Sequence, residues 1–212
     1  MISKNKKCEM SNLLNDSLEK YYWLGFLIAD GHFSKTNRLV VGLSAKDENH
    51  LVKLQHFLKI EKITKTSKKY SKVLIQGMDS EIISTIKNQF KIKSNKTKNP
   101  CDISSIKGDN LLAFSIGLID GDGSICKFSK RKDAFIRVKL YHTWLDNLNY
   151  LFPNRTKINP MGYAEAFITG WPHVKSFKQF AIRHSLPILE RKWDRIDLNY
   201  LNKNERSKKC GS

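Results

Sequence analysis

WLGFLIADG, residues 23–31, decides the fold of this chain, because SIGLIDGDG, residues 115–123, repeats it. The two copies agree at their glycines and at one acid each, aligning Gly25 with Gly117, Asp30 with Asp122 and Gly31 with Gly123. An offset of 92 residues nearly halves a chain of 212, which indicates that one unit has been duplicated. Each copy also poses a physical question, since a carboxylate that ends an apolar helix is costly unless a cation meets it.

The charge of the chain is strongly positive. Lysine and arginine number 38 against 20 acidic residues, which gives a net charge of +18. A surplus of this size predicts attraction to polyanions, with nucleic acid first among them. The alternative explanation is compositional drift toward lysine in an AT-rich genome.

The composition argues against several classes of protein. The chain has no run of about 18 apolar residues, so neither a membrane span nor a membrane partner is expected. The first ten residues, MISKNKKCEM, lack the apolar core of a signal peptide. This predicts an intracellular protein, in a bacterial or phage-infected cytoplasm or in an organelle matrix. The four cysteines lack zinc-ligand spacing and are expected to be reduced thiols.

Periodicity predicts the same order of elements around both copies: helix, two strands, helix, two strands, helix. In the first unit the helices are expected to start after Ser17, after Asp47, and at Asp79 or Ser80. The hairpins of this unit are expected in residues 32–45, turning near Thr36 and Asn37, and in residues 62–77.

The second unit repeats this order and adds a terminal helix in residues 186–201. The expected helices lie in residues 109–120, 144–152 and 173–185, and the expected hairpins in residues 124–142 and 155–170. We therefore divide the chain into a first repeat (1–92), a polar linker (93–108), a second repeat (109–200) and a basic tail (201–212).

The two nonapeptides, at domain spacing in a basic chain, resemble the paired motifs of single-chain LAGLIDADG homing endonucleases. The resemblance covers roughly residues 17–200. It implies an α+β fold in which two pseudo-symmetric repeats form a saddle of two antiparallel sheets, with the motif helices packed at the interface. It also implies a monomer that needs no protein partner and cuts double-stranded DNA at a specific site.

The resemblance further implies that the enzyme hydrolyses one phosphodiester on each strand across the minor groove and leaves short 3′ overhangs. Two alternatives share the fold, namely an RNA maturase that assists intron splicing and a DNA-binding regulator without catalysis. A basic structural or ribosome-associated protein would explain the charge but not the repeated Asp-Gly helices.

The motif residues suggest how the two acids are tolerated. Gly25 and Gly117 have no side chain, so the two helices can approach closely there. Paired helices would place Asp30 and Asp122 side by side, where the two carboxylates repel each other unless a cation lies between them. Hard oxygen ligands favour Mg²⁺, which also binds substrate phosphates. Mn²⁺ is expected to substitute, and Ca²⁺ to support binding without cleavage.

The resemblance implies further members of the site. The main-chain carbonyls just before the two acids, those of Ala29 and Gly121, are expected to help bind metal. A lysine after the closing helix of each repeat is expected to neutralise charge during hydrolysis, and this role falls to Lys96 and Lys192. Asp120 has Ile28 as its counterpart, and this asymmetry predicts a capping or solvated position without chemistry.

Alternation along the strands selects candidate DNA contacts. Leu39, Val41 and Leu43 are expected to face the helices, which turns the residues between them to the other face. The same reasoning applies to residues 136–141. A two-stranded ribbon fits the major groove, and hairpin ends suit phosphates. The residues expected to contact DNA are Ser34, Lys35, Arg38, Val40, Ser44, Lys72, Gln76, Ser124, Lys130, Arg131, Arg137, Lys139, Tyr141, His142 and Lys157.

The charge leads to a test of DNA binding. About 6 to 10 phosphate contacts reduce affinity by roughly 10³ to 10⁵ between 50 and 200 mM salt, because bound counterions are released. Fluorescence anisotropy of a labelled duplex, titrated with the protein at several salt concentrations, measures this slope. Affinity unchanged over this range would mean that the positive charge reflects composition alone.

Overall fold

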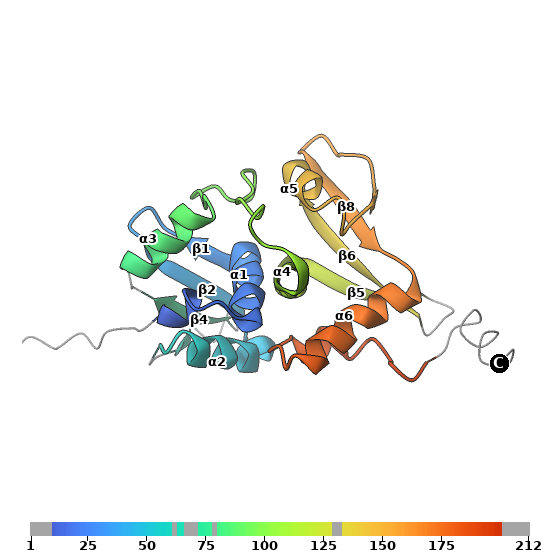
Figure 1. The fold of residues 1–212 in the computed structure, drawn as a ribbon, viewed down its shortest axis with the longest axis horizontal. Coiled ribbons are helices and arrows are strands. Elements are labelled where there is room, and N and C mark those ends of the chain that lie inside the picture. Colours follow the sequence, from blue (N-terminus) through green and yellow to red (C-terminus); the bar gives the residue numbers. More distant parts are fainter. Residues whose placement is uncertain (1–9, 61–62, 66–71, 78–79, 129–132, 201–212) are drawn as a thin grey trace, which may run out of the picture.

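The structure is a computed structural model that describes residues 10–60, 63–65, 72–77, 80–128 and 133–200. Two halves, each an antiparallel sheet with helices, meet at a central pair of helices (Figure 1). This pair consists of α1 (Leu18–Asp30) and α4 (Gly108–Asp122), the two motif helices. The expected α+β architecture with two antiparallel sheets is therefore confirmed.

The first half follows the expected order of elements. Helix α1 starts as expected, since the Ser17 side chain accepts a hydrogen bond from the Lys20 backbone N–H at 3.1 Å. The remaining strands and helices of this half are β1 (Gly31–Phe33), β2 (Leu39–Ser44), η2 (Ala45–Asp47), α2 (Glu48–Phe57), β3 (Ile63–Lys65), β4 (Lys72–Gly77) and α3 (Ser80–Gln89). A short 3-10 helix, η1 (Met10–Leu13), precedes them. Asp79, the other candidate start of α3, lies outside the described residues.

The second half repeats this order after α4. Its elements are β5 (Gly123–Lys127), β6 (Ala134–Tyr141), α5 (His142–Asn147), β7 (Asn154–Arg155), β8 (Tyr163–Ile168), α6 (Trp171–Arg183) and α7 (Glu190–Trp193). The terminal helix is shorter than expected, because only the single turn of α7 is helical within residues 186–200. The rest of this segment is extended or turned. It reaches the central helices at α7 and then runs back along α6, where Trp171 bonds the Tyr200 backbone oxygen (Figure 1).

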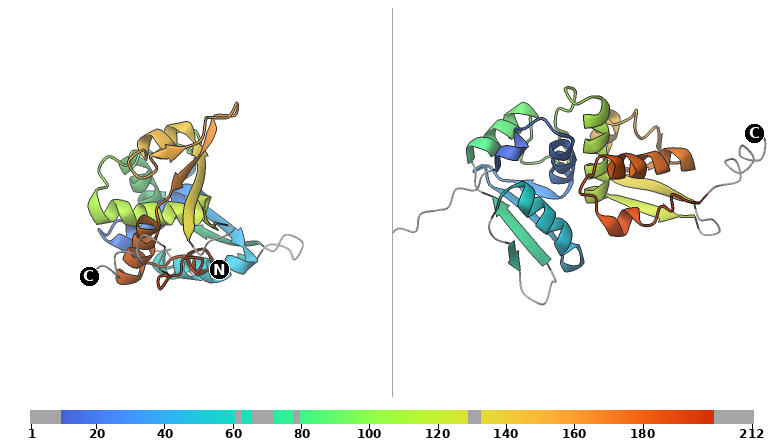
Figure 2. Two further views of the ribbon diagram at one scale, coloured as in Figure 1. Left: turned by 90° about the vertical axis from the view of Figure 1, so that its right-hand side faces the viewer. Right: turned by 60° about the horizontal axis from the view of Figure 1, so that its bottom comes forward.

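The two sheets have the same topology, with strand orders β1-β2-β4-β3 and β5-β6-β8-β7. Their hairpins differ in length. In the first sheet Gly31 pairs with Val41, whereas in the second Gly123 pairs with Val138, so the first hairpin of the second half is five residues longer. Two views from other sides show that the sheets splay away from the central helix pair (Figure 2).

Burial along the strands follows the expected alternation. In β2, Leu39 and Val41 are buried while Gly42 and Ser44 are exposed. In β6 the even-numbered residues from Ala134 to Leu140 are buried, and the odd-numbered residues between them are half-buried or exposed. The core therefore lies between each sheet and its helices, and one face of each sheet stays open.

Two glycines set the distance between α1 and α4. A Cβ at Gly25 would lie 1.9 Å from the backbone oxygen of Phe114, and a Cβ at Gly117 would lie 1.9 Å from that of Tyr22. Real Cβ atoms do not come so close to another heavy atom, so only glycine is accommodated at either position. A Cβ at Gly121 would lie 2.2 Å from the Cβ of Ala29, which keeps the helix ends close as well.

The segment between the halves, residues 93–108, contributes side chains to the core. Cys101, Ile103 and Ile106 are buried in the core, although residues 93–108 are mostly polar. Within the described residues, no helix is long and apolar enough to cross a membrane.

Adding one methyl group at the helix crossing tests this packing. We expect Gly25→Ala and Gly117→Ala each to lower the free energy of unfolding by about 3 kcal/mol, because the backbone of the facing helix cannot move aside. Asp109→Ala, on the exposed first turn of α4, is the control and should change stability by less than about 0.5 kcal/mol. Urea unfolding followed by circular dichroism measures the three values. Unchanged stability in both glycine variants would contradict the close crossing.

Candidate active site

Two carboxylates end the two motif helices. Asp30 is the last residue of α1 and Asp122 the last residue of α4, and both are solvent-exposed on the surface of the folded chain. Partial removal from water raises the pKa of Asp30 to about 6, with a further contribution from the negative charge of Asp122. The pKa of Asp122 is also raised by partial desolvation, which Lys96 and Lys192 oppose. The repeat thus brings the two acids into one electrostatic site.

Lys96 lies over the end of α1. Its Nζ donates hydrogen bonds to the carbonyl oxygens of Ile28 and Ala29, the latter at 2.9 Å. A cation at a helix C-terminus satisfies carbonyls that have no partner within the helix. Desolvation lowers the pKa of Lys96, and the charges of Asp122 and Asp30 oppose that shift.

Lys192 occupies the matching place at the end of α4 and is more buried. Its Nζ donates to the carbonyl oxygens of Asp120 at 2.5 Å, Gly123 at 2.8 Å and Ile119 at 3.1 Å. A longer contact of 3.3 Å reaches Gly121. Burial lowers the pKa of Lys192, although Asp120 and Asp30 favour its charged form. Each acid therefore has one lysine over the end of its own helix.

The sequence predicts a capping or solvated position for Asp120, but this residue is buried. Its side chain is 1% exposed and accepts three hydrogen bonds, from Tyr22 Oη at 2.7 Å, Trp193 Nε1 at 2.7 Å and the Leu189 backbone N–H at 3.0 Å. Asp120 thus joins α4 to α1 and to the turn that carries Lys192. The expectation of solvation is wrong, because the C-terminal segment covers this position.

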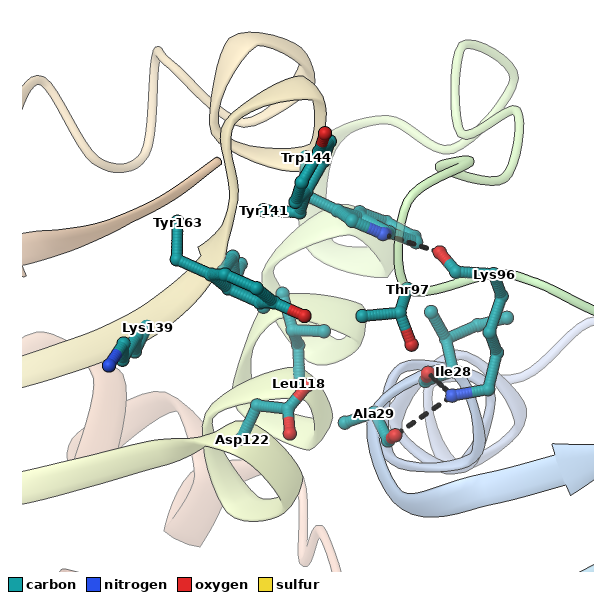
Figure 3. A pocket seen from close by; sticks show the side chains of 11 residues that line it. Ile28, Ala29, Lys96, Thr97, Leu118, Asp122, Lys139, Tyr141, Trp144 and Tyr163 are labelled. Atoms are coloured by element: carbon teal, nitrogen blue, oxygen red, sulfur yellow. Dashed lines mark hydrogen bonds between the residues drawn. The ribbon is translucent and has the colours of Figure 1, made fainter. Parts of the chain in front are cut away.

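A cavity of about 140 Å³ opens beside Asp122 (Figure 3). Ala29, Asp122 and Lys96 line one side of it, and aromatic residues of the second half line the other. The aromatic residues are Tyr141, Trp144 and Tyr163.

Several expected DNA contacts share the open face of the second sheet. Ser124 pairs with Arg137 across β5 and β6, and the Arg137 Nε lies 3.4 Å from Ser124 Oγ. Arg137 also lies 3.8 Å from Glu165, a surface pair that contributes little stability. Lys139 is exposed, whereas Tyr141 is half-buried against Tyr163.

Other expected contacts lie near the ends of the second sheet. His142 starts α5 and is half-buried, with its Nδ1 at 3.9 Å from Asp146. Lys157 is exposed in the β7–β8 connection. Lys130 and Arg131 lie outside the described residues.

The expected DNA contacts of the first half lie in the β1–β2 turn and on strands β2 and β4. Lys35 and Arg38 are exposed in the β1–β2 turn, where Ser34 Oγ accepts a hydrogen bond from the Arg38 backbone N–H at 2.9 Å. Val40 is half-buried and Ser44 is exposed on β2. In the strand register, Lys72 pairs with Ser44 and Gln76 with Val40.

The donors at the helix ends fit a hard divalent cation. Two carboxylates end the crossed helices, close enough for the charge of Asp122 to raise the pKa of Asp30, and the carbonyl oxygens of Ala29 and Gly121 lie next to them in sequence. A carbonyl oxygen has two lone pairs, so its contact with a lysine leaves one acceptor site. Oxygen donors of this kind suit Mg²⁺ or Ca²⁺ better than a soft metal. The described residues contain no cluster of three or more His, Cys, Asp or Glu side chains that could form a separate metal centre.

The residues that hold the lysine-bearing turns are not evident from the sequence. Asp47 was expected to cap α2, but its side chain makes no capping hydrogen bond. It instead forms a bidentate ion pair with Arg191, the neighbour of Lys192, with one N···O distance of 2.6 Å. Trp144 Nε1 donates to the backbone oxygen of Lys96 at 2.8 Å. The signal that could have identified them is their shared position, three residues after the second strand of each repeat.

Comparison with known proteins supports the fold. No family model matches this sequence, and no curated protein matches it. Solved structures do match. The LAGLIDADG meganuclease I-AabMI bound to uncleaved DNA has a TM-score of 0.57 at 12% identity, covering 89% of this chain and 92% of that chain.

Two further matches cover most of both chains. The structure of I-SmaMI bound to an uncleaved DNA target in the presence of calcium ions has a TM-score of 0.54 at 14% identity, covering 93% of this chain and 97% of that chain. The I-LtrWI LAGLIDADG homing endonuclease bound to target DNA has a TM-score of 0.52 at 12% identity, covering 92% and 96%. The resemblance inferred from the two nonapeptides is thereby confirmed at the level of the fold.

The raised pKa of Asp30 makes stability depend on pH. The folded chain holds a proton at Asp30 more tightly than the unfolded chain, so this carboxyl group reduces stability as pH rises from about 4 to about 6. We expect Asp30→Asn to raise the melting temperature at pH 7.5 and to have no effect below pH 4. Differential scanning calorimetry at several pH values measures both.

Asp102→Asn is the matched control with the opposite sign. Hydrogen bonds from Lys91 and Ser104 hold the pKa of Asp102 well below its usual range. Its carboxylate therefore stabilises the folded chain at neutral pH, and this contribution fades as pH falls below about 4. Equal effects of the two variants at pH 7.5 would contradict the electrostatic account of Asp30.

Proposed function

We propose that this chain, which has the two-repeat fold of the LAGLIDADG homing endonucleases, is a site-specific endonuclease of double-stranded DNA. The observation that carries the proposal is the pair of acids, Asp30 and Asp122, at the ends of two crossed helices with one lysine over each end. Similar structures were solved bound to DNA targets, both uncleaved and cleaved.

The chemistry assigned to the site is hydrolysis of one phosphodiester on each strand. Asp30 and Asp122, with the carbonyls of Ala29 and Gly121, would hold a divalent cation, with Mg²⁺ as the physiological ion. When bound, such an ion neutralises phosphate charge and makes a bound water more acidic. Desolvation and the charge of Asp122 raise the pKa of Asp30, and a bound cation would offset both effects, which supports this assignment.

Lys96 and Lys192 supply positive charge beside the acids. Each Nζ is held by carbonyl oxygens at the end of a motif helix, so its position is set before substrate arrives. Preorganised charge of this kind stabilises negative charge that develops on phosphate oxygens in the transition state. The two lysines therefore provide one electrostatic group for each of the two strands.

The open faces of the two sheets are the proposed DNA-reading surface. Arg137 and Lys139 alternate with buried residues on β6. On β2, Val40 is the counterpart of Arg137, and Ser44 is the counterpart of Tyr141. Side chains of this kind on a two-stranded ribbon can reach base edges in the major groove. Lys35, Arg38 and Lys157, near the hairpin ends, suit phosphates.

A single chain is sufficient for this activity, because both acids and both lysines come from one polypeptide. We therefore propose that the protein acts as a monomer on its duplex and that cleavage across the minor groove leaves short 3′ overhangs. No protein partner is required by this arrangement.

Removing one acid at a time tests the proposal. We expect Asp30→Asn and Asp122→Asn each to abolish double-strand cleavage while duplex binding survives or tightens, because each change removes a negative charge without altering side-chain size. The measurement is cleavage of an end-labelled cognate duplex taken from DNA that flanks the gene, with Mg²⁺ or with EDTA. A mobility shift in Ca²⁺ measures binding separately.

Asp102→Asn is the control for charge, since it removes a half-buried acid outside the site. It should cleave at the wild-type rate. Double-strand cleavage by either acid variant near the wild-type rate would mean that Asp30 and Asp122 are turn residues. Binding by the wild type without any cleavage in Mg²⁺ would indicate a DNA-binding regulator instead.

A further inference from the structure

The turn that carries each lysine contacts the opposite half of the molecule. Lys96 follows α3 of the first half, yet its backbone oxygen accepts a hydrogen bond from Trp144 Nε1 of the second half at 2.8 Å. The adjacent Thr143 adds a bond from its Oγ1 to the backbone oxygen of Lys98 at 3.1 Å. Figure 3 shows Trp144 of the second half reaching this turn.

The turn that carries Lys192 is held in the same crossed manner. Lys192 belongs to the second half, but Arg191 beside it forms the bidentate ion pair with Asp47 of the first half. Glu190, on the other side of Arg191, pairs at 2.5 Å with Lys53 of α2. The Asp47 side chain is 6% exposed, so this pair is shielded from water on one side.

Asp47 and Trp144 are equivalent positions in the repeat. Strand β2 ends at Ser44 and strand β6 ends at Tyr141, so each residue stands third after the second strand of its half. The side chains differ completely, one an anion and the other an indole. Both nevertheless bind the turn that carries the lysine of the other half.

We infer that Asp47 and Trp144 are equivalent positioning residues, each of which holds the site lysine of the opposite repeat in place, Asp47 for Lys192 and Trp144 for Lys96. This inference rests on the proposed function in that it gives the two lysines a role in cleavage. It adds that neither half can form its own site alone. Each lysine is positioned by contacts of its Nζ at the end of its own motif helix and by contacts of its turn with the other half.

Asp120 explains why the two anchors need not be alike. The turn of Lys192 also docks on the Asp120 side chain through Leu189 and Trp193, whereas the counterpart Ile28 has no polar side chain. The turn of Lys96 depends instead on Trp144 and Thr143. The two turns therefore have different supports but the same crossed connection.

Chemical labelling of the two lysines tests the inference without relying on cleavage. The full-length protein is treated briefly with acetic anhydride, and acetylation of each lysine is measured by mass spectrometry of peptides. We expect Asp47→Ala to raise the labelling rate of Lys192 about tenfold and to leave that of Lys96 unchanged, because the lost ion pair frees only one turn. Trp144→Phe keeps an aromatic ring but removes the Nε1–H donor. It should raise the labelling rate of Lys96 and leave that of Lys192 unchanged.

Matched controls separate positioning from general loosening. Trp171→Phe also removes an indole donor, which bonds the Tyr200 backbone oxygen at 3.0 Å, and it should change neither lysine. Asp47→Glu should restore slow labelling of Lys192, because it keeps the charge that pairs with Arg191. If Asp47→Ala does not fold, Arg191→Gln removes the same ion pair from the other side. If Trp144→Phe does not fold, Thr143→Val removes the hydrogen bond to the Lys98 backbone oxygen in the same turn.

Strand-resolved cleavage supplies the functional readout. On a duplex labelled separately on each strand, Asp47→Ala should slow the cutting of one strand and Trp144→Phe that of the other, each about tenfold. Equal labelling of both lysines in each variant, or exposure of the lysine of the same half, would overturn the inference. If the wild type cuts no DNA, the proposed function fails, while the labelling result still decides whether the anchoring is crossed.

Discussion

The close crossing of α1 and α4 is the constraint on which the rest of the structure depends. Gly25 and Gly117 let the backbone of each helix lie directly against the other, and Gly121 keeps the ends together next to Ala29. Because both helices end at this crossing, their terminal carboxylates are brought into one site. The strands that follow leave in opposite directions and build one sheet on each side (Figure 1).

The crossing also explains the electrostatics of the site. Two helices that end side by side present carbonyl oxygens as well as carboxylates, so negative potential accumulates there. Lys96 and Lys192 offset part of it, but desolvation and the charge of Asp122 keep the pKa of Asp30 raised. The folded chain thus keeps an unfavourable arrangement of charge that a bound cation would relieve, as expected where function opposes stability.

Much of this architecture was predictable because the decisive signals are local and occur twice. The repeated nonapeptide gave the two helices, the acids and the glycine crossing, and alternation gave the buried faces of β2 and β6. The partners of Asp47 and Asp120 were not predictable, since Arg191 and Trp193 are more than 70 residues away from them in sequence. The terminal helix was overestimated because tertiary contacts of Trp193, and not helical hydrogen bonds, hold the segment around it.

The unequal hairpins have a consequence for the shape of any target. The first hairpin of the second half is five residues longer than its counterpart, whereas the connection from Ser44 to its partner Lys72 is longer than the connection from Tyr141 to its partner Tyr163. A duplex read by two identical arms can be palindromic, because the symmetry of the site mirrors the symmetry of the protein. Arms of different length and side-chain composition remove that symmetry. Under the proposed function, the preferred DNA sequence should therefore have two unlike halves and a defined direction.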